Sequence, residues 1–225
     1  MSSLSKKEFA LYEIMKLIAS GQLGKNGALF HENEIVEHLS VSRTPIRDAI
    51  SKLAGDGLIE IIPQVGMRLK EFDDNDLREI FTVRECVEPY ASIIFLEQLQ
   101  SIPREFEEKV SQLELISKRM KWAADESNIN EFLLQDTMFH SLIAQCAGLS
   151  LVTNIIGQIG DRIRVVGFIS TPDKKSMNVV VKEHLAICKA LRSKDKTRIE
   201  TATIVHINRT KIRLEKGHKR QIFNL

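Results

Sequence analysis

Cysteine is scarce in this sequence, and the three residues present form no recognisable pattern. Cys86, Cys146 and Cys188 lie far apart without a Cys-x-x-Cys pair, so no disulfide framework is indicated and a reducing compartment is expected. Long apolar runs are also lacking. The first twenty residues do not contain the unbroken apolar stretch of a signal peptide, and no segment approaches the roughly eighteen apolar residues of a membrane span. We therefore expect a cytoplasmic protein with no membrane association.

A strong excess of either charge is absent as well. Lys and Arg number 32 against 30 Asp and Glu, which gives a net charge of +2. This balance excludes a polybasic coat for nucleic acid but not specific binding, which depends on where the charges lie. The 225 residues are 43% hydrophobic, which is enough for two small domains with packed cores.

The first 71 residues have the pattern of a winged helix-turn-helix. Helical periodicity predicts helices over 7–20 and 32–39 and a third that opens at Ser42, with Pro45 in its first turn, where a missing amide hydrogen costs nothing. The runs LIEII and MRLKEF flank the turn PQVG and predict a hairpin. Three helices followed by such a hairpin make a winged helix.

The rest of the sequence predicts helices alone. No strand-like alternation follows residue 71, and prolines and a glycine divide the apolar periodicity into segments. The predicted helices span 74–98, 103–125, 127–147, 149–169, 173–193 and 195–215. The expected fold class is therefore mainly α, with a winged helix-turn-helix over 1–71 joined to an all-α helical bundle over 72–225.

The third predicted helix has the composition of a helix that reads DNA. It begins Ser42-Arg43-Thr44-Pro45-Ile46-Arg47, with two arginines and two hydroxyls around a proline. Amides and hydroxyls of a recognition helix bind phosphates, and a guanidinium group matches O6 and N7 of guanine. A solvated start of a surface helix has the same composition, so these residues alone leave both interpretations open.

A longer segment favours the DNA-reading helix, because it resembles a known family. VSRTPIRDAISKLAGDGLIEIIPQVGMRL resembles the signature of the GntR family of bacterial transcriptional regulators, VSRTPVREAL followed by L-x-x-x-GL and a glycine-bearing wing. The resemblance implies a homodimer on a palindromic operator in double-stranded DNA. The arginines would enter the major groove, the hydroxyls would hold phosphates, and the wing tip would approach the minor groove. The implied contacts are Ser42, Arg43, Thr44, Arg47 and Gly66. Asn33 departs from the pattern, because many members carry a longer or basic side chain there.

Four polar residues in the second domain indicate a metal site. Asp136 and His140 are four residues apart on a predicted helix, so they project from one face. His184 and His206 lie among apolar residues on two further helices. Together they can converge inside a bundle and hold a divalent transition metal. Each histidine can equally be an isolated buried side chain bonded to a backbone carbonyl, and the spacing does not decide between the two.

The surrounding segments resemble the FCD ligand-sensing domain of the FadR subfamily. DTMFH, EHLAICKALRSKD and the later histidine match its pattern, in which one aspartate and three histidines from separate helices bind the metal. The segment FTVRECVEPYASIIF resembles its opening helix through Arg84 and Glu88. The sequence departs from the pattern at 147–149, where members often have a small residue followed by Gly-Asn. By this resemblance the metal ligands are Asp136, His140, His184 and His206.

A metal held in this way predicts a ligand sensor. Four protein ligands leave two positions of an octahedral ion for a small carboxylate or hydroxy acid, whose other oxygens can pair with arginine. Arg84 is the first candidate because its helix is otherwise apolar and faces inward, and Arg164 is a weaker one. Imidazole ligands suit zinc, nickel or iron, so the identity of the metal stays open.

We therefore expect a regulator, in the simplest case a repressor, whose DNA binding a small carboxylate controls through the metal. One alternative is a metal-dependent enzyme acting on a small carboxylate, since such a site can activate water. Against it, the sequence places no further carboxylate as a general base. A second alternative is a regulator in which the metal is purely structural.

Overall fold

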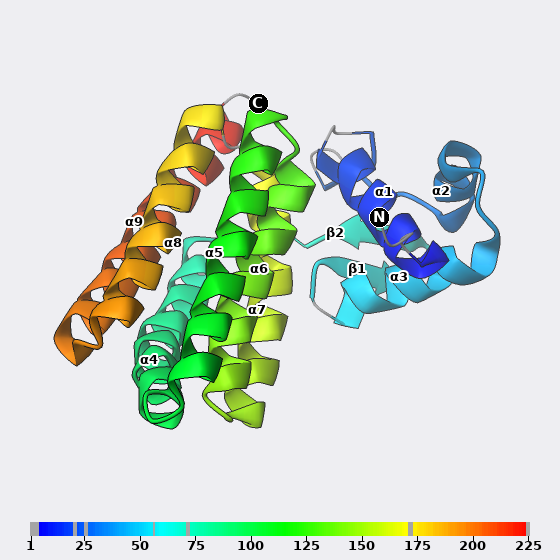
Figure 1. The fold of residues 1–225 in the computed structure, drawn as a ribbon. Coiled ribbons are helices and arrows are strands. Elements are labelled where there is room, and N and C mark those ends of the chain that lie inside the picture. The colour runs from blue at the N-terminus through cyan, green and yellow to red at the C-terminus, as the bar shows by residue number, and fades with distance from the viewer. Residues whose placement is uncertain are drawn as a thin grey trace. The chain divides into compact units, whose positions relative to one another are not determined.

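A computed structural model describes residues 5–19, 22–24, 27–55, 57–70, 73–170 and 173–223 of the chain. The chain separates into two compact units, Met1–Phe72 and Asp73–Leu225. The first unit is a small helical head with a hairpin, and the second is helical throughout its described part (Figure 1). This architecture confirms the predicted fold class.

The head consists of three helices and one antiparallel hairpin. Helices α1 (Lys6–Ala19), α2 (Glu32–Leu39) and α3 (Arg43–Gly55) precede strands β1 (Ile59–Ile62) and β2 (Gly66–Leu69). The apolar positions of α3 recur every three or four residues, so they form one buried stripe that packs against α1 and β1. The opposite face of α3, which begins with two arginines, stays exposed.

A short β-bridge fixes the hairpin to the helical part of the head. Phe30, just before α2, exchanges two backbone hydrogen bonds with Met67 of β2, at 2.8 and 2.9 Å. Gly66 makes this close approach possible. Its φ is +142°, and a Cβ there would lie 3.0 Å from the His31 ring. The wing is therefore part of the packed head.

The second unit is a bundle of long helices that lie side by side (Figure 1). Helix α4 packs on α9, α5 on α6 and α8, and α6 on α7. In the described part of the chain, no helix has both the length and the apolar character needed to cross a bilayer. The helices are α4 (Asp74–Leu99), α5 (Pro103–Asp125), α6 (Ile129–Cys146), α7 (Ser150–Ile169), α8 (Lys174–Ser193) and α9 (Lys196–Phe223).

The bounds of these helices agree with the predicted ranges to within a few residues, except at the end of the last one. Helix α9 was expected to end near residue 215, but it continues through Gly217 to Phe223. Gly217 serves a close approach here, because a Cβ at this position would lie 2.8 Å from Cβ of Ser170. The glycine is thus a packing residue inside the helix and does not end it.

Side-chain caps define where several helices begin. Asp73 accepts hydrogen bonds from the backbone N–H groups of Asn75 and Asp76, at 2.9 and 2.8 Å, and so caps α4. Asn128 caps α6 in the same way, and Asp173 caps α8. These caps fix the start of three helices that carry polar residues of the bundle interior.

Two glycines bring α7 unusually close to α6. A Cβ on Gly160 would lie 2.5 Å from Cγ2 of Thr137, and one on Gly167 would lie 2.9 Å from Cδ2 of Leu133. Because the glycines are seven residues apart, they share one face of α7. Thr137 follows Asp136 directly on α6, so this contact sets the position of the helix that bears the first candidate metal ligands.

The apolar core lies directly beside the polar centre of the bundle. It is built from buried residues of α4, α5, α6, α8 and α9, among them Phe95, Phe106 and Phe139. The ring of Phe139 stacks on that of His184, with 4.2 Å between centroids and an interplanar angle of 12°. The core thus packs directly against one of the candidate ligand rings.

Candidate functional site

The exposed start of α3 carries the residues predicted to contact DNA. Ser42, Arg43, Thr44 and Arg47 are all exposed, whereas Pro45 between them is buried against the head. An exposed pair of arginines beside two hydroxyls is the arrangement that a recognition helix presents to a duplex. The structure therefore brings these four predicted residues together on one accessible surface.

Helix α2 supplies partners for both arginines of this surface. Arg43 donates through Nη1 to Glu32 Oε1 at 3.1 Å and to Asn33 Oδ1 at 3.0 Å. Arg47 donates through Nε to the other oxygen of Glu32 at 2.8 Å. The hydrogen bond from Arg47 lowers the pKa of Glu32, although partial burial opposes this shift, so the carboxylate is ionised at neutral pH.

The wing differs in detail from its prediction. Its tip is formed by Pro63, Gln64 and Val65, which are all exposed. Gly66 was expected at the tip, but it is the first residue of β2 and pairs with Ile62. Its position next to His31 explains the glycine by packing within the head.

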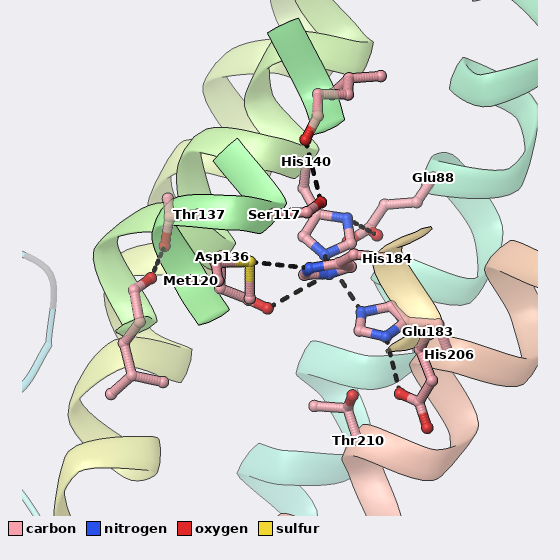
Figure 2. Close-up of polar contacts among 12 residues, drawn as sticks. Glu88, Ser117, Met120, Asp136, Thr137, His140, Glu183, His184, His206 and Thr210 are labelled. Atoms are coloured by element: carbon pink, nitrogen blue, oxygen red, sulfur yellow. Dashed lines mark hydrogen bonds and ion pairs between the residues drawn. The ribbon is translucent and has the colours of Figure 1, made fainter. Parts of the chain in front are cut away.

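In the second unit, the four predicted metal ligands meet in the interior of the bundle. Asp136 and His140 come from α6, His184 from α8 and His206 from α9 (Figure 2). All four are buried, and one ligand atom from each lies within 4.8 Å of all the others. The structure thus joins residues of helices that are separated by up to two further helices in the sequence.

The inner atoms of this cluster are three ring nitrogens and one carboxylate. Nε2 of His140 lies 3.2 Å from Nε2 of His184 and 3.2 Å from Nε2 of His206. Nε2 of His184 lies 3.4 Å from the carboxylate of Asp136. Ring nitrogens about 3 Å apart are what metal–nitrogen bonds of about 2.1 Å produce. The donor set, three imidazoles and one carboxylate, therefore fits a divalent transition metal.

Outer carboxylates determine which nitrogen carries the proton in two of the three rings. Nδ1 of His140 lies 2.9 Å from Glu88, and Nδ1 of His206 lies 3.1 Å from Glu183 (Figure 2). A carboxylate can only accept, so each of these Nδ1 atoms carries the proton and each Nε2 offers its lone pair to the centre. The third ring, His184, has only the thioether of Met120 at its Nδ1, at 3.0 Å.

Two arginines neutralise the outer carboxylates. Arg84 is 2% exposed and pairs with Glu88 through Nε and Nη2. Arg213 pairs with both oxygens of Glu183, at 2.9 and 2.7 Å. Burial alone would raise the pKa of Glu88, but Arg84 and the His140 ring outweigh it and hold that pKa below its ordinary value. The same balance lowers the pKa of Glu183 to about 2, through the His206 hydrogen bond and Arg213.

These carboxylates bear on the alternative of an enzyme. From the sequence no further carboxylate was expected as a general base, and in the structure Glu88 and Glu183 each contact one candidate metal ligand. Their lowered pKa values and arginine partners make them poor proton acceptors near neutral pH, so they orient ligands and are unsuited to general-base work. For Glu88, the i, i+4 spacing from Arg84 was a signal in the sequence. No such signal exists for Glu183, because its histidine partner lies on another helix.

Arginines 84 and 164 were the candidates for binding a small acid. Nη2 of Arg84 lies 3.1 Å from Nε2 of His140, so this guanidinium borders the cluster directly. Its Nη1 is buried and has no hydrogen-bond partner among the described residues. Arg164 lies on α7, which packs on α6, and is half-buried.

Each unit matches one known protein family or domain. The family described as bacterial regulatory proteins, gntR family, matches residues 6–69, and the FCD domain matches residues 79–209. The chain is 27% identical over 202 residues to the HTH-type transcriptional repressor RspR of Escherichia coli strain K12, covering 88% of this chain and 84% of RspR. It is 30% identical over 144 residues to the gluconate operon transcriptional repressor of Bacillus subtilis, covering 64% of this chain and 56% of that repressor.

Solved structures show the same fold. Escherichia coli McbR/YncC aligns with a TM-score of 0.72 at 17% identity, over 95% of this chain and 99% of that one. A transcriptional regulator described as GntR from Rhodococcus sp. RHA1 aligns with a TM-score of 0.69 at 17% identity, over 95% and 99%. At these identities the likeness concerns the fold alone.

The buried histidines predict a pH-dependent stability in metal-free protein. Burial lowers the pKa of His184 and of His206 below the ordinary 6.5, so both rings stay neutral in the folded unit while the unfolded chain takes up protons. The free energy of unfolding should therefore fall as the pH drops below about 6.5. Urea unfolding in chelator, followed by circular dichroism at about pH 7.5 and about pH 5.5, measures this. His184→Gln should weaken the dependence, and equal stability of the native protein at both pH values would contradict the prediction.

Proposed function

Because the chain belongs to the gntR family of bacterial regulatory proteins and carries an FCD domain, we propose that it is a repressor controlled by a small carboxylate bound at a divalent metal. It is a DNA-binding transcriptional regulator and not an enzyme. The finer proposal rests on one observation, the four buried side chains whose ligand atoms face one another in the second unit. We further propose that it acts in the cytoplasm as a homodimer on a palindromic operator, each head binding one half-site.

The metal proposal follows from the charge and direction of the inner atoms. Three imidazole nitrogens and one carboxylate point at a common centre, and buried acceptors without a donor or a cation are costly. Asp136, His140, His184 and His206 would hold the ion, which would offer an acidic small molecule its remaining coordination positions. The residues Glu88 and Glu183 keep two of the rings in the tautomer that such binding needs.

The proposal of a carboxylate effector follows from Arg84. Its Nη1 is buried without a hydrogen-bond partner among the described residues, although its other nitrogens contact Glu88 and His140. A buried guanidinium N–H that lacks an acceptor is unfavourable, and a carboxylate oxygen is the acceptor that suits it best. Arg164 would act as a second, more distant cation. Effector binding at this site would favour one conformation of the bundle and so change how the heads bind DNA. This is an allosteric coupling between distinct sites.

DNA reading by α3 is testable with two substitutions. Arg43→Ala and Arg47→Ala should each weaken binding to the selected operator by about 1–3 kcal/mol, because each removes a guanidinium that would pair with guanine. Fluorescence anisotropy on a labelled duplex measures this at one fixed salt concentration. Arg198→Ala, an exposed arginine on α9, is the control and should bind like the native protein. Native affinity in both α3 variants would refute the proposed contacts.

Metal content tests the central site. Purified protein should contain about one divalent ion per protomer, and His140→Ala together with His184→Ala should abolish it, since each removes a nitrogen from the proposed donor set. Elemental analysis after gel filtration measures the ratio. His38→Ala, an exposed histidine of α2, should leave it unchanged. Native protein that holds no metal even after reconstitution with zinc, nickel or iron would rule the site out.

Thermal unfolding with a panel of mono-, di- and tricarboxylates tests the effector. At least one acid should raise the melting temperature of zinc-loaded protein, by stabilisation of about 2.7 kcal/mol at a hundredfold excess over its dissociation constant. The same acid should have little effect in chelator, because the metal supplies part of its site. Arg84→Lys should reduce the shift, whereas Arg198→Lys should not. Zinc-loaded protein that responds to none of these acids would indicate a purely structural metal.

A further inference from the structure

The first two residues of α2 hold the guanidinium groups of α3 in the absence of DNA. Glu32 contacts both arginines, one with each carboxylate oxygen, and Asn33 adds a second contact to Arg43. The side chains of Arg43 and Arg47 are nevertheless 55% and 65% exposed. Exposed ion pairs of this kind add little to the stability of a fold. The main effect of these ion pairs is therefore to fix the position and orientation of the two guanidinium groups.

The atoms engaged by α2 differ between the two arginines. Arg47 uses Nε, so both of its terminal nitrogens remain available. Arg43 uses Nη1, whose two hydrogens serve Glu32 and Asn33, so Nε and Nη2 remain available. A guanidinium reads guanine through two neighbouring N–H groups. Arg47 can therefore make this contact with its end, the Nη1 and Nη2 groups. Arg43 can make it with its side edge, the Nε and Nη2 groups.

A carboxylate beside this surface is unfavourable for attraction to phosphates. Glu32 carries a negative charge at neutral pH, and hydrogen bonding to Arg47 lowers its pKa below the ordinary value. It adds a negative charge to a surface that must approach the DNA backbone, so it lowers general affinity for any duplex. Fixing two flexible side chains before binding, however, reduces the rotational freedom that each loses in a specific complex. The arrangement favours discrimination between sequences over affinity.

We propose that Glu32 and Asn33 are positioning residues that determine operator specificity, by presenting the end of Arg47 and the side edge of Arg43 to the bases. The inference rests on the proposed reading of DNA by these two arginines. Glu32 acts on both, whereas Asn33 acts on Arg43 alone. Asn33 thereby takes part in recognition through its neighbour, at a position where a longer basic side chain would reach DNA itself.

Selection from a duplex library with a randomised core tests this with the full-length protein. Arg43→Ala and Arg47→Ala first identify the base position that each arginine reads. Glu32→Gln should then reduce base preference at both positions, by about 10-fold, while general affinity rises. Asn33→Ala should reduce it only at the position of Arg43. The slope of the logarithm of affinity against that of salt concentration should stay unchanged in both, because no phosphate contact is lost.

Glu37→Gln is the matched control, since it removes the same charge from an exposed position of the same helix. It should raise general affinity and leave every base preference intact. If Glu32→Gln behaves like Glu37→Gln and Asn33→Ala selects like the native protein, the positioning role is refuted although the arginines still read DNA. If the two arginine variants themselves select native sequences, the proposed reading fails instead. Asn33→Ala keeps the charge of the head, so it decides the matter should Glu32→Gln lower the melting temperature.

Discussion

Acceptor atoms buried face to face govern the second unit. The inner nitrogens of His140 and His206 and the carboxylate of Asp136 are acceptors, and taking such groups out of water without compensation is costly. Positive charge among or beside these atoms provides the compensation. Arg84 provides part of it at His140, and a divalent ion would provide the rest. Because α4, α5, α6, α8 and α9 all contribute a side chain to this region, the centre joins most of the bundle.

In both units a carboxylate is shared between two nitrogen-bearing side chains, but its role differs. In the bundle, Glu88 and Glu183 are each shared between a histidine and an arginine, which fixes the ring and neutralises the carboxylate. In the head, Glu32 is shared between two arginines and restricts both. The difference is burial. The buried carboxylates need cationic partners to remain ionised, whereas Glu32, whose side chain is 24% exposed, lies at the surface and orients its two arginines.

The fold is predictable from the sequence to the extent that its signals are local. Apolar periodicity and the prolines that interrupt it define the helices of the bundle, but Gly217 does not end α9 because a tertiary contact requires it there. The spacing of aspartate and histidine on α6 is a local signal too. The outer partners are not local: Glu183 precedes His184 in the sequence but bonds to His206, since helix packing selects the partner. The thioether beside His184 likewise follows from packing of α5.

The glycine face of α7 links the candidate metal centre to a helix whose described residues supply none of its candidate ligands. A Cβ at Gly160 would lie 2.5 Å from Cγ2 of Thr137, and Asp136 is the residue just before Thr137 on α6. A larger residue at position 160 would therefore press on the turn of α6 that carries Asp136. Under the proposed sensing function, mutations that abolish the response to effector would then map to the contact between α6 and α7 as well as to the four polar residues. Sequence comparison restricted to those four would underestimate how much of the chain is under constraint.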